Sequence, residues 1–193
     1  MKNTILISKD ILMKDYLAPY GNKDYITPNI SELAEKGTVF NRHYTAAPST
    51  AMAFTSMFTG KYAYETDRKK YTEVDEYSGV TLFDKLNELG YETHVLWDQR
   101  YVYLAQRYSK CYGKNTTIHS VDWLTKDIPP HVKGKYDDLT YRPQYTEKLL
   151  IEMHKFLESL VSGKTNVFLW IHFPHVLAGR NTYGSDLDVF DKI

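Results

Sequence analysis

The sequence contains a run of consecutive apolar residues late in the chain, Val167-Phe168-Leu169-Trp170-Ile171, with polar residues on both sides. A short apolar run rich in β-branched and aromatic residues predicts a strand that is buried on both faces. A second run of the same character, Thr4-Ile5-Leu6-Ile7-Ser8, lies near the start of the chain. Such strands are typical of parallel sheets, whose crossover helices cover both faces.

Helical segments separate the predicted strands. Residues 27–37 have residues typical of helix termini at both ends. Thr27 is a candidate N-cap, Pro28 suits the first helical position, and Gly37 can adopt the left-handed backbone conformation that ends many helices. Periodicity and turn residues predict further helices at 51–58, 81–89 and 144–161, and further strands at 39–44, 92–97 and 116–120. This alternation predicts an α/β fold with a mainly parallel, doubly wound sheet flanked by helices.

Composition excludes several classes of protein. The 193 residues include 24 Lys and Arg and 24 Asp and Glu, so the formal net charge is zero and no nucleic-acid partner is expected. Cys111 is the single cysteine, which excludes an internal disulfide and a CxxC metal site. No apolar stretch approaches the roughly 20 residues that span a bilayer. If these residues are the whole protein, we expect it to be cytoplasmic.

Polar residues at predicted strand and helix ends are the candidates for chemistry, because ligands of parallel sheets bind at the carboxyl ends of strands. Ser49 and Thr50 open a helix, where a hydroxyl faces unpaired backbone N–H groups and can attack a phosphate or sulfate held by them. The alternative is an ordinary helix cap. Asp10 follows the first strand and is either a cation ligand or a turn-stabilising residue.

His172 and His175 lie at the end of the last predicted strand. Two imidazoles there can contact an anionic substrate, donate a proton or bind a metal; the alternative is a structural role. Arg100 can pair with phosphate or take part in a surface ion pair.

Several segments together resemble one family. They are the Thr27-Pro28-Asn29 helix that ends at Gly37, the Thr59-Gly60-Lys61-Tyr62 turn, and Gly90-Tyr91-Glu92-Thr93. In this order and spacing, the chain resembles the N-terminal half of the sulfatase family, within the alkaline phosphatase superfamily. The resemblance covers most of residues 4–97 and resumes near 166–193.

The resemblance implies an α/β fold with a metal-assisted nucleophile. It places the first metal-binding Asp on Asp10 and the nucleophile, which also contacts the metal, on Thr50, with Ser49 as second choice. It assigns substrate contact to His175, with His172 close by, and we add Arg100 to that group. The implied cofactor is a divalent cation, with Ca²⁺, Zn²⁺, Mn²⁺ and Mg²⁺ as alternatives.

The chain departs from the family at the nucleophile. Sulfatases carry Cys or Ser in a C/S-x-P-S-R motif that is oxidised to formylglycine, whereas this chain has Thr50-Ala51-Met52-Ala53-Phe54. The lysine and histidine of the family's G-K-W-H segment align with Asp98 and Arg100. A threonine nucleophile is similar to that of phosphoethanolamine and phosphoglycerol transferases of the superfamily, which form a phospho-threonine.

We therefore interpret residues 1–193 as the N-terminal part of a sulfatase-like catalytic domain. The family's later Asp-His pair of metal ligands is absent from these residues, so the fold is expected to be incomplete and the fragment alone inactive. A C-terminal half or a partner chain would complete it. The expected substrate is an anionic phosphate or sulfate ester, such as a glycan or lipid head group. The alternative is a non-catalytic domain of the same fold that binds an anion or a partner.

Overall fold

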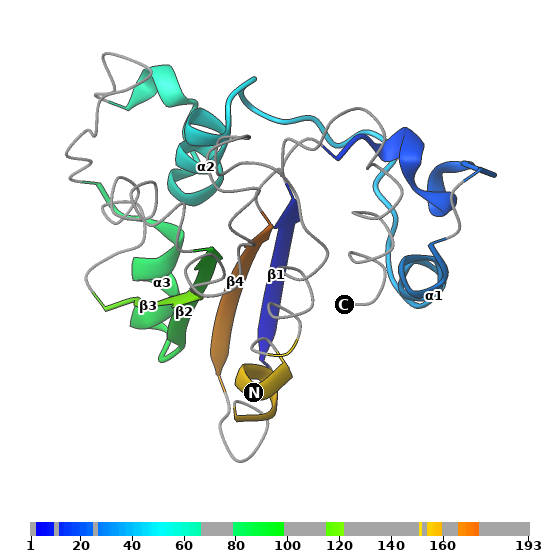
Figure 1. The fold of residues 1–193 in the computed structure, drawn as a ribbon. Helices are drawn as coiled ribbons and strands as arrows, with labels where there is room; N and C mark the ends of the chain where they lie inside the picture. Colours follow the sequence, from blue (N-terminus) through cyan, green and yellow to red (C-terminus); the bar gives the residue numbers. More distant parts are fainter. Residues whose placement is uncertain are drawn as a thin grey trace, which may run out of the picture. The chain divides into compact units, whose positions relative to one another are not determined.

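The computed structural model describes residues 3–9, 12–24, 27–66, 79–98, 115–121, 151, 154–159 and 166–173. The chain divides into two compact units. The first comprises residues 1–10, 44–122 and 157–174, and the second comprises residues 11–43, 123–156 and 175–193. The β-sheet, whose strands are drawn as arrows in Figure 1, belongs to the first unit.

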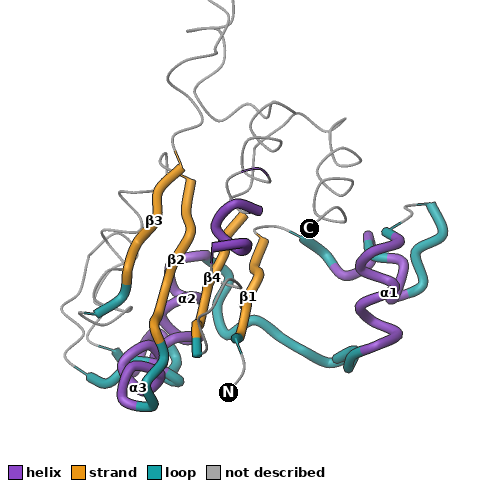
Figure 2. Tube along the Cα trace, turned by 90° about the horizontal axis from the view of Figure 1, so that it is seen from below, coloured by secondary structure: helices purple, strands orange, loops and turns teal. Residues whose placement is uncertain are grey.

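The sheet of the first unit has four strands, all parallel to their neighbours. They are β1 (Thr4–Lys9), β2 (Glu92–Asp98), β3 (Thr117–Val121) and β4 (Val167–Phe173), in the spatial order β1-β4-β2-β3 (Figure 2). The predicted parallel α/β sheet is confirmed. β4 lies between β1 and β2, and this central position explains why its sequence is apolar on both faces.

Strand register decides which side chains share a face of the sheet. In the β1–β4 pair, Leu6 lies opposite Trp170 and Ser8 lies opposite His172. In the β2–β4 pair, Val95 lies opposite Trp170. Because side chains alternate along a strand, these residues project from the same face.

Helix α2 (Thr50–Thr59) packs on this face. Ser49 is its N-cap, and the Ser49 hydroxyl accepts a hydrogen bond from the Met52 backbone N–H at 3.4 Å. The helix ends at Gly60, whose φ of 68° is a left-handed conformation that glycine adopts without a steric penalty. The prediction of a helix stopped by Gly60 is confirmed, with Thr50 as its first residue.

Helix α3 (Leu82–Glu88) packs on the same face and begins with a reciprocal capping box. The Thr81 hydroxyl accepts a hydrogen bond from the Asp84 N–H at 3.2 Å, and the Asp84 carboxylate accepts one from the Thr81 N–H at 2.9 Å. The predicted helix at 81–89 is therefore confirmed.

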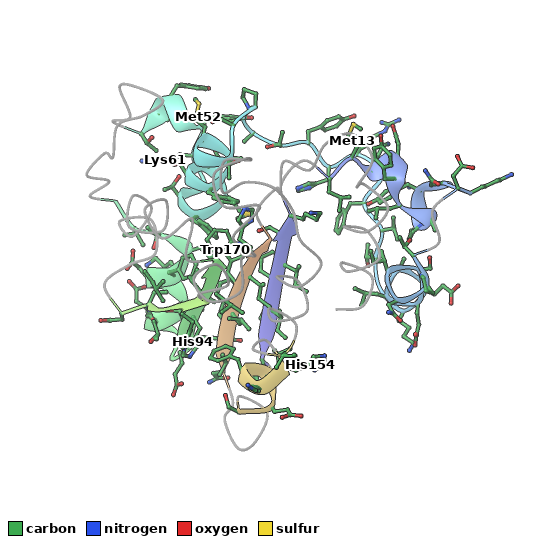
Figure 3. The ribbon with its side chains drawn as sticks, viewed as in Figure 1. Met13, Met52, Lys61, His94, His154 and Trp170 are labelled. Carbon is green, nitrogen blue, oxygen red and sulfur yellow. The ribbon has the colours of Figure 1, made fainter. Side chains whose placement is uncertain are left out.

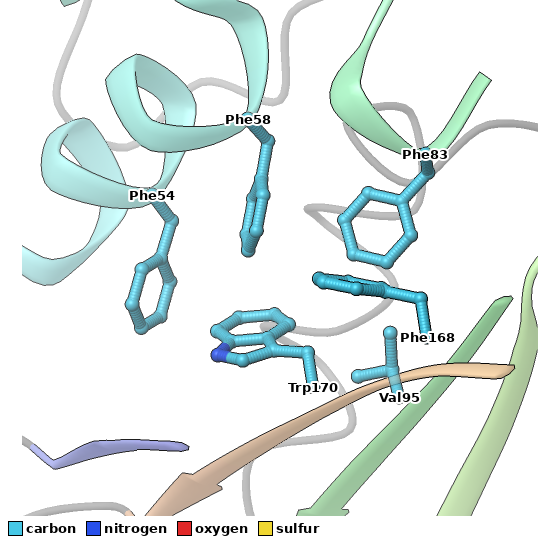
Figure 4. Close-up of a cluster of buried hydrophobic side chains, with 6 residues drawn as sticks. All are labelled: Phe54, Phe58, Phe83, Val95, Phe168 and Trp170. Atoms are coloured by element: carbon cyan, nitrogen blue, oxygen red, sulfur yellow. The ribbon is translucent and has the colours of Figure 1, made fainter. Parts of the chain in front are cut away.

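An aromatic cluster joins the two helices to the sheet (Figure 4). Its members are buried and come from α2, α3, β2 and β4: Phe54, Phe58, Phe83, Val95, Phe168 and Trp170. Phe58 meets both Trp170 and Phe83 edge-on, with ring centroids 4.6 Å and 4.9 Å apart. Contacts of this geometry stabilise a core beyond the area that they bury.

The second unit contains α1 (Pro28–Lys36) and two short 3₁₀ turns, Lys14–Tyr16 and Ala18–Tyr20. Pro28 is the first helical residue, as predicted. The Thr27 hydroxyl does not cap the helix; it accepts a hydrogen bond from the Ala18 N–H at 3.2 Å instead.

Two local predictions were wrong. Gly37 has an extended backbone, with φ −120° and ψ −154°, so α1 does not end in a left-handed residue. Residues 39–44 form no strand; the Phe40 and Tyr44 side chains are 67 % and 81 % exposed, and the segment pairs with no described strand. Of the predicted helix at 144–161, residues 154–159 are helical and most of the remainder lies outside the described residues.

Candidate active site at the carboxyl ends of β1 and β4

The direction of α2 over the sheet places the start of the helix beyond the carboxyl end of β4. Phe54 packs edge-on against both Trp170 and His172, with centroids 4.8 Å apart in each case. One turn later, Phe58 packs against Trp170 and, through Phe83, approaches the start of β4 at Phe168. The helix therefore runs antiparallel to β4 (Figures 3 and 4).

Thr50 lies one turn before Phe54, on the same side of the helix. It is the first residue of α2, and its side chain is partly buried. The N-terminus of a helix concentrates unpaired N–H groups and a positive partial charge, which favours a bound anion. Thr50 therefore presents its hydroxyl where the sheet and the helix both favour an anionic ligand.

Ser49, the second choice for the nucleophile, acts as the helix cap. Its hydroxyl oxygen accepts from the Met52 N–H, so this oxygen already has a structural role at the end of the helix. The sequence left a cap and a nucleophile open for these two hydroxyls. The structure assigns the cap to Ser49.

A polar cluster of the buried Trp170 and His172 and the half-buried Ser8 lies beneath the first turns of α2. The Ser8 hydroxyl is 2.9 Å from His172 Nδ1, and it accepts a hydrogen bond from Trp170 Nε1, also at 2.9 Å. Register pairing of Ser8 with His172 brings these side chains together from neighbouring strands. The cluster joins the last residues of β1 and β4 to the Trp170 indole, against which α2 packs.

The His172 side chain is 3 % exposed and lies inside β4, not past its end as predicted. Burial lowers the pKa of His172 from 6.5 to about 3, because desolvation disfavours the charged imidazolium. The nearby Lys9 charge acts in the same direction, and a hydrogen bond with the Ser8 backbone opposes both. His172 is therefore a neutral imidazole at physiological pH.

The other predicted site residues, Asp10, Arg100 and His175, lie outside the described residues. Asp10 is the residue that follows the last residue of β1, Lys9. Within the described residues, no group of three or more His, Cys, Asp or Glu side chains can share a metal ion. Thr50 can supply one hydroxyl oxygen of the kind that hard cations prefer, and the Asp10 carboxylate belongs to the same chemical class of ligand.

Sequence reasoning missed the role of Ser8, which it treated only as the end of a strand. It also assigned no role to His94 and His119, which meet on the opposite face of the sheet. His94 Nδ1 lies 3.1 Å from His119 Nε2, and the Glu92 carboxylate lies 3.7 Å from His94 Nε2. Burial, and secondarily the neighbouring His94, lower the pKa of His119. Only the register of β2 and β3 reveals this pair.

No helix in the described segments combines the length and the apolar character needed to cross a membrane.

We compared the chain with known protein families and proteins. The sulfatase family model matches residues 2–182. The uncharacterized sulfatase YidJ of Escherichia coli (strain K12) is 24 % identical over 177 residues, which cover 88 % of this chain and 32 % of YidJ. The chain therefore spans about a third of the length of this relative.

Two solved structures share the fold. Ps i-CgsB, solved in complex with k-i-k-neocarrahexaose, has a TM-score of 0.64 and 22 % identity over 100 % of this chain and 49 % of that protein. The phosphonate monoester hydrolase of Agrobacterium radiobacter has a TM-score of 0.62 and 16 % identity over 91 % of this chain and 41 % of that enzyme. With the family match over nearly all of its residues, the chain belongs to the sulfatase family.

Proposed function

We propose that this chain forms part of a metal-dependent enzyme that cleaves or transfers phosphate or sulfate esters, with Thr50 as its nucleophile. The observation that carries the proposal is the position of Thr50. Its hydroxyl stands at the N-terminus of α2, and α2 begins beyond the carboxyl end of β4. The neighbouring Ser49 hydroxyl is the helix cap, which gives it a structural role.

The proposed reaction begins with attack of Thr50 Oγ on the phosphorus or sulfur atom of the ester. A bond forms from Thr50 Oγ to that atom, the ester bond to the leaving oxygen breaks, and the hydroxyl proton passes to a base. The first-turn N–H groups of α2 stabilise the negative charge of the transferring group. Water or an acceptor hydroxyl then takes the group from Thr50.

Asp10 and Thr50 are the residues that would hold the divalent cation. Such an ion lowers the pKa of the hydroxyl and neutralises charge on the transferring group. Ca²⁺, Zn²⁺, Mn²⁺ and Mg²⁺ are the alternatives. We assign His175 to the substrate or leaving group, and Arg100 to the anionic part of the substrate.

The names of the structural relatives agree with an anionic ester as substrate. One relative is a phosphonate monoester hydrolase, and another, BT1596, is a 2-O GAG sulfatase. A glycan or a lipid head group carrying a phosphate or sulfate ester therefore remains our proposed substrate class. The threonine favours phosphodiesters over sulfate esters, because the oxidisable Cys or Ser of the family is replaced by Thr50.

The test uses the full-length protein with each of the four cations in turn. Turnover of an aryl phosphodiester is compared with turnover of an aryl sulfate, for the wild type, Thr50→Ala and Ser49→Ala. We expect phosphodiester turnover that a chelator abolishes, that Thr50→Ala abolishes and that Ser49→Ala largely keeps. Faster turnover of the sulfate would identify a sulfatase. Metal or anion binding without any turnover would instead support the non-catalytic alternative.

A further inference from the structure

The polar cluster of Ser8, Trp170 and His172 contacts the two elements that carry residues of the proposed reaction. Ser8 is two positions before Asp10, and both belong to the segment at the end of β1. His172 contacts the ring of Phe54, and Phe54 is one helical turn after Thr50. One hydrogen-bonded cluster thus touches both elements that carry the proposed nucleophile and metal ligand.

We propose that Ser8 and His172 are positioning residues: their hydrogen bond reinforces the backbone pairing at the end of β1, and the His172 ring holds the first turns of α2 in place through Phe54. This inference rests on the proposed function, since it assigns these residues to the geometry of Thr50 and Asp10. Neither residue is placed in contact with substrate.

The hydrogen bonds of the cluster support positioning in preference to simple core filling. An apolar pair would fill the same space without hydrogen bonds, and burying polar groups is unfavourable unless they find partners. The Ser8 hydroxyl has such partners: Trp170 Nε1 and His172 Nδ1 each lie 2.9 Å away, and the Ile171 carbonyl oxygen lies 3.5 Å away. The directional bonds hold the Ser8 hydroxyl, the indole and the imidazole in one arrangement, which apolar packing alone does not specify.

The geometry also shows how a displacement of the His172 ring would move α2. The ring centroids of Phe54 and His172 are 4.8 Å apart with an interplanar angle of 85°, so a displaced imidazole shifts the ring that anchors α2. Thr50 lies on the same side of that helix. Misplacement of a nucleophile by about 1 Å can cost on the order of a hundredfold in rate.

The experiment compares three variants in the full-length protein. His172→Phe keeps an aromatic ring beside Phe54 but removes the bond to Ser8, and Ser8→Ala removes the same bond from the other side. His172→Asn is the rescue variant, because its amide can again pair with the Ser8 hydroxyl. The matched control is His94→Phe, which removes a similar histidine bond from the opposite face of the sheet.

We expect His172→Phe and Ser8→Ala to lower kcat for the aryl phosphodiester by about tenfold to a hundredfold, with little change in KM. The double variant should lose no more than the worse single variant, because both remove one bond. His172→Asn restores a partner for Ser8 but lacks the ring beside Phe54, so it should recover only part of kcat. His94→Phe should keep the wild-type kcat. The unfolding transition of each variant gives its folded fraction, and kcat is calculated per folded molecule. A loss of stability is then not mistaken for a loss of positioning.

Unchanged kcat in folded His172→Phe and Ser8→Ala would overturn the inference and leave the proposed function intact. So would an equal loss in His94→Phe. If the wild type turns over neither ester, the proposed function has failed, and Mn²⁺ affinity measured by calorimetry decides the inference. Weaker Mn²⁺ binding in Ser8→Ala and His172→Phe, but not in His94→Phe, would support positioning of the β1 end. Equal affinities, or no Mn²⁺ binding by the wild type, would overturn it.

Discussion

The Ser8 hydroxyl and His172 Nδ1 lie 2.9 Å apart, although the two residues are 164 positions apart in the sequence. They meet because β1 and β4 pair in parallel with Ser8 opposite His172. This contact connects the strand that leads to Asp10 with the surface on which α2 rests. The buried His172 thereby contacts both elements that carry the proposed active-site residues.

The buried state of His172 predicts that acid destabilises the fold. His172 has a pKa of about 3 in the folded protein and 6.5 in the unfolded chain, so between these values the unfolded state binds the extra proton. The stabilisation by neutral His172 is therefore complete above pH 6.5 and is lost as the pH falls toward 3. Between these two pKa values, the free energy of unfolding should fall by up to about 1.4 kcal/mol for each unit by which the pH decreases.

Urea unfolding of the full-length protein between about pH 7 and pH 4 measures this effect. We expect the free energy of unfolding of the wild type to fall more steeply with acid than that of His172→Phe, which lacks the titrating group. Parallel pH dependences in the two proteins would contradict the assignment of a neutral, buried His172.

Ser49 is predicted to matter for stability more than for catalysis. Its hydroxyl caps α2 through the Met52 N–H, and loss of such a cap costs about 1 kcal/mol. Ser49→Ala should therefore lower the free energy of unfolding by about that amount, while Ser49→Gly loses only a few tenths of a kcal/mol. Chemical denaturation checks both values. Loss of turnover in folded Ser49→Ala would show that Ser49 takes part in the reaction.

Phe58 is predicted to be one of the largest contributors to the aromatic cluster. It is 1 % exposed and touches rings from α3 and β4. Phe58→Ala should lower the free energy of unfolding by about 3–5 kcal/mol, because it removes buried apolar surface and leaves a cavity. Phe58→Leu, the matched control, should lose less. A loss below about 1 kcal/mol in Phe58→Ala would mean that the cluster collapses to fill the space.

The strands and helices of the first unit could be predicted because their signals are local. The apolar run of β4 and the left-handed glycine after α2 each act within a few residues. Residues 39–44 have the composition of a strand but lack a described neighbour with which to pair, so composition alone misled. Gly37 permits a left-handed conformation without requiring it, and the chain leaves α1 in an extended one.

The candidate site could be predicted only in part, because its residues come from distant segments. Hydroxyls at the start of α2 were recognisable from the small-residue turn that precedes them. Which of the two hydroxyls caps the helix depends on one hydrogen bond, from the Met52 N–H to the Ser49 hydroxyl, that the sequence does not specify. The Ser8–His172 contact depends on strand register, which long-range packing sets.

The central claim is that Thr50 carries the transferred group. The most direct measurement is peptide mapping by mass spectrometry, after the full-length protein has been incubated with an aryl phosphodiester and quenched in acid. We predict a phosphoryl ester on Thr50, none on Ser49, and no modified peptide in Thr50→Ala, which also loses turnover. A phosphoryl group on Ser49, or full turnover by Thr50→Ala, would contradict the account.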